Sequence, residues 1–346
     1  MGSLVKNQTL IETDLPRQIR VSTGSAIVLG LLEGKLNAEP TTTYLMTYKV
    51  GKCTANCGFC PQARNSHSNA ELLSRVSWPT FPLNSVLKKI GHKSEHCKIM
   101  RVCIQALNYP DVFTHLTALV AAIKQHTSIP ISISCQPLNK ENIRRLADAG
   151  AERIGIPIDA ATEKLFSEVK GENAHGPYTW KQQFRQLCEA VEVFGRGRVS
   201  THLIIGLGET EKEAVDLIQK CVDIDVIPAL FAFTPIRGTK LEMKPQPLVE
   251  SYRRIQLARH LIINRKTRSE CMHFDSSGHL TDYGIKKEKL AWIVEDGKPF
   301  LTSGCPNCNR PFYNEKPSGP IYNYPRQIYK KEIVEIKQQL GLKQNG

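Results

Sequence analysis

The sequence has no long apolar run, and this absence limits where the protein can reside. Its apolar stretches, such as Ala26–Leu32, are far too short to cross a bilayer. The N-terminus carries Glu12 and Asp14 and lacks the basic, apolar and small-residue pattern of a secretory signal. We therefore expect a cytoplasmic protein that does not act on a membrane.

Low-complexity segments and the composition of a disordered chain are also missing. Apolar residues make up 41% and charged residues 23% of the 346 residues, which are values typical of globular proteins. The length is about twice that of a typical domain, yet it also fits a single large α/β barrel.

Acidic residues are scarce relative to basic ones. The chain has 33 Asp and Glu against 46 Lys and Arg, so its formal net charge is +13. Such an excess suggests an acidic partner, or it serves solubility alone. The eleven cysteines are an odd number, and thiols stay reduced in the cytosol, so clustered cysteines indicate metal binding or catalysis before disulfides.

Strand-like segments alternate with helical ones along the chain. The strand candidates are Thr43–Val50, Lys98–Gln105, Ile131–Cys135, Arg153–Ile158, Val199–Ile205, Pro228–Phe233, Cys271–Phe274 and Pro299–Thr302. Segments with apolar residues about every 3.6 positions lie between them: Val112–Lys124, Lys140–Ala149, Trp180–Val193, Glu211–Val222 and Glu250–Asn264.

Eight strands, each followed by a covering segment, predict an α/β fold of the (β/α)8 TIM-barrel type. The periodicity alone leaves an open sheet or a six-strand partial barrel as alternatives. We expect an N-terminal helical segment over residues 1–40, the barrel over 41–310 and a C-terminal extension over 311–346. The basic tail Pro325–Gly346 has the pattern of an amphipathic helix.

The strongest chemical signal is a run of three cysteines directly after the first predicted barrel strand. Cys53, Cys57 and Cys60 lie within eight residues, so three thiolates can converge on one face of an iron–sulfur cube. A cluster with only three protein ligands leaves one iron open for a substrate or cofactor. The alternative is a zinc knuckle, although zinc sites usually supply two close pairs and a fourth ligand.

The spacing C-x-x-x-C-x-x-C after this strand resembles the signature of the radical S-adenosylmethionine (SAM) superfamily. The longer stretch Gly51–Arg64 is similar to biotin synthase and its sulfur-inserting relatives, and the resemblance extends over about residues 41–310. It implies a [4Fe–4S] cluster whose open iron binds S-adenosylmethionine, which is reductively cleaved to a 5′-deoxyadenosyl radical.

The same resemblance assigns the cofactor-binding residues. Phe59 stands at the aromatic position whose backbone meets the adenine, and Asp159 matches the aspartate that binds the ribose. Pro157 replaces the family's asparagine, so ribose recognition must differ in detail. The turn after the fifth barrel strand, which approaches the cofactor in biotin synthase, contributes Gly206, Gly208 and Glu209.

An auxiliary iron–sulfur cluster is the second expectation from the family. Cys103 and Cys135 fall where biotin synthase holds two ligands of such a cluster, although each is alternatively a small buried hydrophobe. Cys305 and Cys308 form a C-x-x-C pair expected at the C-terminal face of the barrel, and we expect these four cysteines to surround one cubane. Alone, the pair is equally typical of half a zinc site or a redox pair.

Two positions depart from the biotin synthase pattern. The family's third cysteine is Ser200 here, and its arginine ligand is His273. Both changes argue against an unaltered second cluster of that type, and Cys271 is a reserve ligand.

Taken together, the resemblance implies a sulfurtransferase. A radical abstracts hydrogen from an unactivated carbon and a cluster sulfide captures the carbon. The altered pattern is closest to the archaeal-type two-component lipoyl synthase, with biotin synthase as the alternative and another radical chemistry on the same scaffold not excluded.

The expected partners are an acidic octanoyl or lipoyl carrier domain, a second radical-SAM protein and an electron donor such as ferredoxin. A zinc-stabilised RNA-binding protein is the competing hypothesis from another class, but the chain lacks an aromatic–basic RNA motif, and we expect no nucleic-acid partner.

Overall fold

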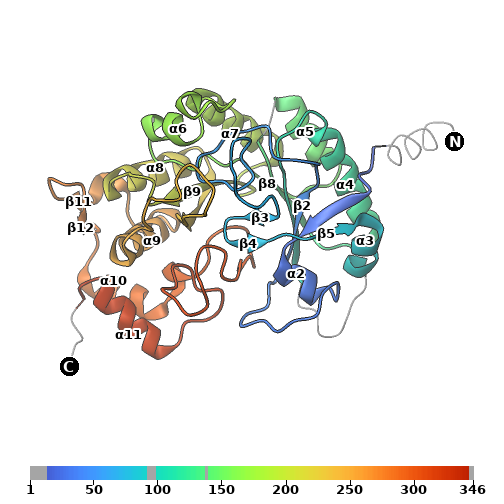
Figure 1. Cartoon of the computed structure of the whole chain (residues 1–346). Coiled ribbons are helices and arrows are strands. Elements are labelled where there is room, and N and C mark those ends of the chain that lie inside the picture. The colour runs from blue at the N-terminus through green and yellow to red at the C-terminus, as the bar shows by residue number, and fades with distance from the viewer. Residues whose placement is uncertain (1–13, 92–98, 137–138, 343–346) are drawn as a thin grey trace.

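One eight-stranded sheet organises the molecule (Figure 1). The computed structural model describes residues 14–91, 99–136 and 139–342. Its strands follow the order β10-β9-β8-β7-β6-β2-β1-β5. The six parallel strands are β2 (Thr42–Thr47), β6 (Arg101–Gln105), β7 (Ile131–Ser134), β8 (Arg153–Gly155), β9 (Val199–Ile205) and β10 (Val226–Ala232).

The sheet ends in two antiparallel strands, β1 (Gln18–Val21) and β5 (Thr80–Pro82). Residues 18–21, which we expected within an N-terminal helical segment, thus belong to the sheet, and only the short helix α2 (Thr23–Val28) follows them. Residues 1–13 of that segment lie outside the described residues. Because the strand order runs from β10 to β5, the TIM-type α/β fold is present as an open barrel with six parallel strands.

The seventh and eighth predicted barrel strands were wrong. Residues 271–274 form the end of a 3-10 turn (Ser269–Cys271) and the short strand β11 (His273–Phe274), which pairs with β12 (Leu280–Asp282) in a separate hairpin. Residues 298–300 form another 3-10 turn, where Pro299 lacks the N–H that a central strand donates. A short apolar segment does not determine which strand it pairs with, and of residues 271–274 only Met272 is buried.

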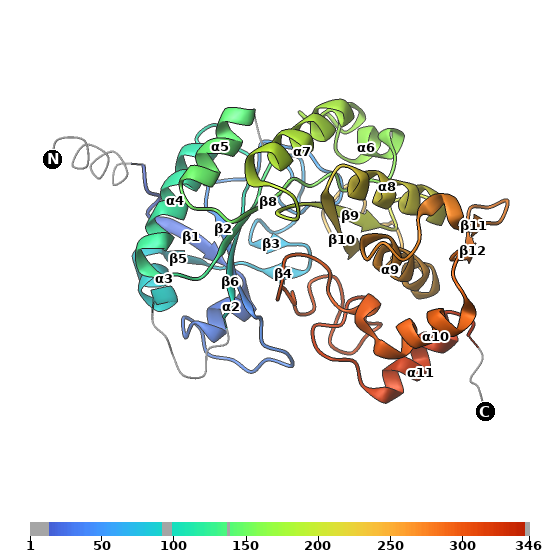
Figure 2. The same ribbon diagram turned by 180° about the vertical axis from the view of Figure 1, so that it is seen from behind.

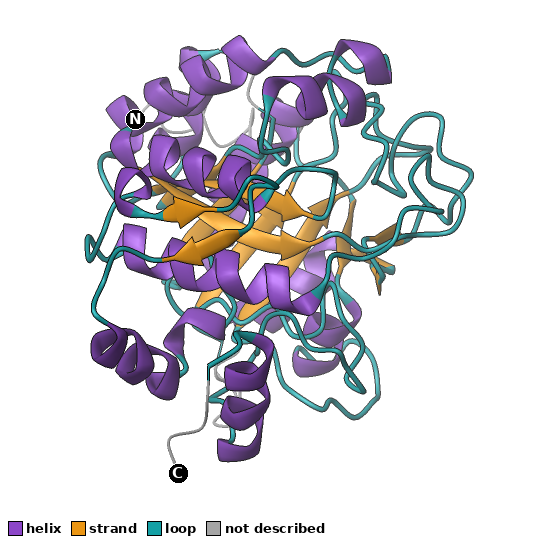
Figure 3. Ribbon diagram, turned by 90° about the vertical axis from the view of Figure 1, so that its left-hand side faces the viewer, coloured by secondary structure: helices purple, strands orange, loops and turns teal. Residues whose placement is uncertain are grey.

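Helices cover the outer side of the sheet, and long loops gather at one side of it (Figure 3). The helices that follow the parallel strands are α3 (Leu83–Gly91), α4 (Val112–His126), α5 (Lys140–Asp148), α6 (Glu163–Val169), α7 (Trp180–Phe194), α8 (Glu211–Asp223) and α9 (Val249–Ile263). In α4, Leu116, Leu119, Val120 and Ile123 are buried, which is the i, i+3, i+4, i+7 stripe of a helix packed on a core. A capping box formed by Thr210 and Glu213 begins α8.

The C-terminal part of the chain packs beside α9. Helices α10 (Lys287–Asp296) and α11 (Lys330–Gln339) lie side by side in both views (Figures 1 and 2). Ile333 and Ile336 of α11 are buried, as expected for an amphipathic helix in the tail. None of the helices in the described residues is both long and apolar enough to cross a membrane.

A closing segment, residues 301–324, bridges the open side of the sheet. At one end, Ser303 Oγ accepts a hydrogen bond of 2.7 Å from the backbone N–H of Leu230 on the edge strand β10. At the other, the Asn309 side chain accepts one of 3.0 Å from the N–H of Thr41, just before β2. This segment therefore stands where the two missing barrel strands were expected.

Candidate active site

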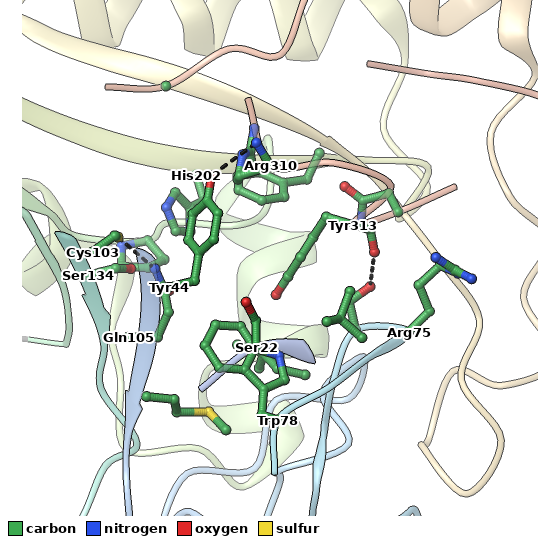
Figure 4. A pocket seen from close by; sticks show the side chains of 18 of the residues that line it. Ser22, Tyr44, Arg75, Trp78, Cys103, Gln105, Ser134, His202, Arg310 and Tyr313 are labelled. Carbon is green, nitrogen blue, oxygen red and sulfur yellow. Dashed lines mark hydrogen bonds between the residues drawn. The ribbon is translucent and has the colours of Figure 1, made fainter. Parts of the chain in front are cut away.

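A cavity of about 540 Å³ lies inside the open barrel. Its walls come from β2, β6, β7, β9 and β10, from the loop after β2 and from the closing segment. Figure 4 shows Tyr44, Cys103, His202, Arg310 and Tyr313 around it. The exposed lining residues mark the cavity mouth, which we define as Lys35, Asn37, Ser77 and Pro317. The volume is in the range of sites that bind small molecules.

Cys53, Cys57 and Cys60 line one part of this cavity together. Burial raises the pKa of the Cys60 thiol to about 12, and nearby Cys53 adds to the shift. Burial likewise raises the pKa of Cys57 well above its usual value, with contributions of the same sign from Cys60 and Cys53. The three predicted thiols are therefore close enough to act on one another electrostatically.

Backbone hydrogen bonds hold the loop that carries these thiols, which we call the cysteine loop (residues 53–60). The Cys60 N–H donates to the Cys57 carbonyl at 3.0 Å, and the Cys53 N–H donates to the Gln62 carbonyl at 2.9 Å. The Cys53 sulfur accepts an N–H from Asn108 at 3.1 Å. These hydrogen bonds hold the cysteine loop in place, so its three sulfurs are positioned before any cluster binds.

Asp159 lines the cavity in a backbone conformation with φ +70°, which a non-glycine residue rarely adopts. Its N–H donates to the His202 carbonyl and its carbonyl accepts the Ile204 N–H, each at 2.8 Å, so β9 holds it from both sides. The predicted ribose-binding aspartate is therefore fixed at the end of β8.

Lys170, which the sequence analysis missed, is the partner of this aspartate. The lysine is fully buried, and its Nζ donates to Asp159 Oδ2 at 2.6 Å and to the Pro157 carbonyl. The ammonium also lies 5.3 Å from the centre of the Tyr178 ring and opposes the rise in the pKa of Cys57. A lysine at the end of a helix ordinarily indicates a solvated face, so no sequence signal distinguishes it.

The remaining predicted cofactor residues divide into two groups. Phe59 lines the cavity, whereas Gly206, Gly208 and Glu209 do not. The Glu209 carboxylate accepts the N–H groups of Gly206, Leu207 and Gly208 at 2.6, 3.0 and 3.1 Å. Burial raises its pKa despite these bonds. In this structure the glutamate braces its own turn, and its contact with a cofactor stays a prediction.

A second set of cysteines lines the same cavity. Cys103 lies on β6, and burial raises its pKa to about 12, with Cys305 and Cys308 adding to the shift. Cys135 after β7 also lines the cavity, where burial alone raises its pKa to about 12. Cys103, Cys305 and Cys308 are thus brought together, whereas Cys135 shares the cavity without a comparable influence on them.

Tyr44 and Arg310, which the sequence analysis also missed, hold Cys308. The Tyr44 hydroxyl accepts the Arg310 backbone N–H at 2.9 Å and lies 3.2 Å from the Cys308 sulfur. Because its oxygen accepts from Arg310, its own hydrogen is available to the sulfur. The Arg310 guanidinium lies 3.7 Å from the centre of the Phe231 ring and lowers the pKa of Cys308 against the effect of burial.

The two departures from the family pattern lie in different places. Ser200 lines the cavity. His273 is exposed on β11, and Cys271 is exposed just before it; neither lines the cavity. His273 and Cys271 therefore lie outside the site. The prediction that Cys271 is a reserve ligand of the auxiliary cluster is wrong.

The donor set fits iron–sulfur clusters. In the described residues, no three His, Cys, Asp or Glu side chains surround a single ion position. A cubane does not require that arrangement, because each of its cysteines binds a different iron. Buried thiols favour the neutral form, and binding to iron deprotonates them. Each cysteine set also has cationic side chains beside it, Lys170 and Lys52 at the first set and Arg310 at the second, which suits an anionic thiolate group.

Comparisons with known proteins agree with this chemistry. The model of the Radical SAM superfamily matches residues 48–221. The biotin synthase of Clostridium acetobutylicum is 21% identical over 264 residues, which cover 73% of this chain and 77% of that protein. The biotin synthase of Chlamydia pneumoniae is 24% identical over 219 residues and 61% of each chain, so this chain spans less than two thirds of that relative.

Among solved structures, methylornithine synthase resembles this chain with a TM-score of 0.51 and 13% identity. The match covers 70% of this chain and 67% of that one. A likeness at this identity shows the fold alone.

Proposed function

Because the chain belongs to the radical SAM superfamily, we propose that it inserts sulfur into an unactivated C–H bond of its substrate. It is a radical SAM enzyme, and the proposal concerns what the radical is used for. One observation carries it: two separate sets of cysteines line a single cavity. One set suits a cluster that generates the radical, and the other suits a cluster that donates sulfur. A substrate bound in the cavity would lie next to both.

Cys53, Cys57 and Cys60 are the proposed ligands of the [4Fe–4S] cluster that the family implies. When bound there, the cluster and S-adenosylmethionine supply a 5′-deoxyadenosyl radical. The chain's own contribution is to orient the cofactor. Phe59 and Asp159 line the cavity beside the thiols, and Lys170 fixes the Asp159 carboxylate.

Cys103, Cys305 and Cys308 are the proposed ligands of an auxiliary cluster, with Cys135 as a fourth thiol on the same cavity. When bound there, such a group supplies sulfide. Tyr44 and Arg310 orient Cys308, and Gln105 donates a hydrogen bond of 3.1 Å to the Cys103 sulfur. Hydrogen bonds to sulfur ligands tune the reduction potential of a cluster.

The comparisons support dethiobiotin as the substrate, since both relatives reported above are biotin synthases. The cavity supports a substrate with an apolar carbon chain. Met46, Leu73, Val76 and Trp78 are among its lining residues. Apolar walls bind and orient such a chain by excluding water from it.

An octanoylated carrier domain is the second candidate substrate, in a lipoyl synthase reaction. Two observations favour it: the net charge of +13 would steer an acidic domain, and Ser200 replaces the cysteine that biotin synthase uses. In this case the octanoyl chain enters at the cavity mouth, and a second radical-SAM protein completes the pair of sulfur insertions.

An anaerobic turnover assay tests the proposal. The reconstituted enzyme is offered dethiobiotin and an octanoyl-lysine carrier in parallel, each with and without a second radical-SAM protein. We expect a sulfurated product from one of them, together with 5′-deoxyadenosine. Protein that contains zinc in place of iron and sulfide would contradict the proposal and favour the nucleic-acid-binding alternative.

The double variant Cys305→Ala/Cys308→Ala separates the two cysteine sets. It should still form 5′-deoxyadenosine but no sulfurated product, and should lose about half of its iron. A folded variant with full iron content that still inserts sulfur would eliminate the donor role. General misfolding would instead favour a structural zinc site at this pair.

A further inference from the structure

A turn between β10 and α9, residues 237–244, covers the outer side of the cysteine loop. The Leu241 N–H donates to the Gly58 carbonyl at 3.1 Å. A Cβ added at Gly58 would lie 3.5 Å from Leu241 Cγ and 3.6 Å from Lys240 Cβ. Gly58 directly follows Cys57, so one hydrogen bond and one layer of side chains connect the cysteine loop to this surface.

This turn combines exposed positive charge with an exposed apolar side chain. Arg237 and Lys240 are exposed, and Met243 is 90% exposed, more than any other large hydrophobic residue in the described chain. Glu242 is the only acid of the turn, and its Oε2 accepts the Gly238 N–H at 2.6 Å. We call Arg237, Lys240 and Met243 the cationic turn surface.

The cationic turn surface is separate from the cavity mouth. No residue of 237–244 lines the cavity, whereas Lys35, Asn37, Ser77 and Pro317 do. A macromolecule that binds at 237–244 therefore reaches the cysteine loop from outside and leaves the mouth open for substrate.

We propose that the cationic turn surface is the docking site of an acidic one-electron carrier protein. The inference rests on the proposed function, in which the cluster of the cysteine loop is reduced before the cofactor is cleaved. In the docked complex one electron passes from the reduced carrier to this cluster; the carrier is oxidised, the cluster is reduced, and no bond forms or breaks. A small apolar centre with a charged rim suits a transient complex that forms by electrostatic steering.

Charge reversal with two reductants tests the proposal. The variant Arg237→Glu/Lys240→Glu leaves Leu241 in place and keeps the Cβ atom at position 240 beside Gly58. Cofactor cleavage by the holoenzyme is measured with dithionite and, separately, with a reduced acidic [4Fe–4S] ferredoxin. We expect an unchanged rate with dithionite and a loss of about tenfold or more with ferredoxin at low salt, because exposed charges attract strongly there. High salt should bring the wild-type rate with ferredoxin close to that of the variant.

A matched control has the same change in net charge. Lys287 and Lys289 are exposed on α10 and do not line the cavity. The variant Lys287→Glu/Lys289→Glu should keep the ferredoxin-driven rate. Binding of oxidised ferredoxin, measured by calorimetry, should weaken in the first variant and not in the second.

Three results would overturn the docking site. They are an equal loss in both variants, an unchanged ferredoxin rate and affinity in the first variant, and a loss with dithionite as well, which would indicate damage to the cysteine loop. Failure of the proposed function has a different signature: the wild-type holoenzyme would then still form 5′-deoxyadenosine with dithionite and with ferredoxin, but no sulfurated product from dethiobiotin or from the octanoyl-lysine carrier.

Discussion

At the scale of single residues, the site depends on cations that have no recognisable sequence signal. Lys170 and Arg310 come from segments far apart in the chain, yet each lies beside one cysteine set. The cysteines themselves were identifiable because three thiols within eight residues rarely serve packing. Their charged neighbours were not, since a lysine or arginine acquires its role only from the atoms that surround it after folding.

Removal of the Lys170 ammonium should destabilise the protein. The change Lys170→Met leaves the Asp159 carboxylate buried without its cation, which typically costs about 3–5 kcal/mol. We expect the free energy of unfolding in urea to fall by an amount of this order, and the affinity for S-adenosylmethionine to fall with it.

The matched control for this change is Lys170→Met combined with Asp159→Asn, which removes both charges. This double variant should recover much of the lost stability while the cofactor affinity stays low. Equal stability of the single variant and the wild type would show that the ion pair is not needed to hold Asp159.

At the scale of elements, the turn between β9 and α8 shows what a sequence motif leaves open about the role of its side chains. The glycines after the strand predicted a turn, and the resemblance to biotin synthase implied that this turn lies near the cofactor. The structure adds that Gly206 has φ +105° and packs against Pro247, where a Cβ would lie only 2.8 Å from Pro247 Cδ. The sequence does not show that the Glu209 side chain turns back to accept the N–H groups of its own turn. It therefore could not distinguish a glutamate that stabilises the turn from one that binds a ligand.

Loss of the Glu209 carboxylate should therefore loosen the turn. Glu209→Ala leaves three backbone N–H groups without their acceptor, and the cost should be about 1–3 kcal/mol in the free energy of unfolding. Cofactor affinity should fall with no change in iron content. Asp216→Asn on α8 is the control, since its exposed ion pair with Lys212 contributes less than about 1 kcal/mol. A variant as stable as the wild type would remove the bracing role.

At the scale of the whole molecule, the alternation of strands and helices predicted the six parallel strands and five of the covering helices to within a few residues, but it missed α3 and α6. It failed where Cys271–Phe274 and Pro299–Thr302 were assigned to the barrel. Hydrophobic periodicity indicates which residues of a segment face the core. It does not indicate which strand the segment pairs with, because that strand can be far away in the sequence. The closing segment consists mostly of turns, which carry no periodicity at all.

The proposal of two clusters makes a prediction about iron content. Replacing Cys53, Cys57 and Cys60 together with alanine should abolish cleavage of S-adenosylmethionine but leave about half of the iron bound, because the second set keeps its own ligands. Iron and labile sulfide are measured after anaerobic reconstitution. A triple variant without any iron, or with the full amount, would contradict the presence of two independent sites.

The closing segment gives the two cysteine sets different histories during folding. Cys53, Cys57 and Cys60 belong to one short loop with local hydrogen bonds, so bringing their sulfurs together costs little conformational entropy of the chain. Cys103 comes close to Cys305 and Cys308 only after about two hundred intervening residues have folded and the closing segment has spanned the barrel. The second cysteine set is therefore completed last, and iron bound by it, as proposed, would be a sign that the closing segment has reached its native position.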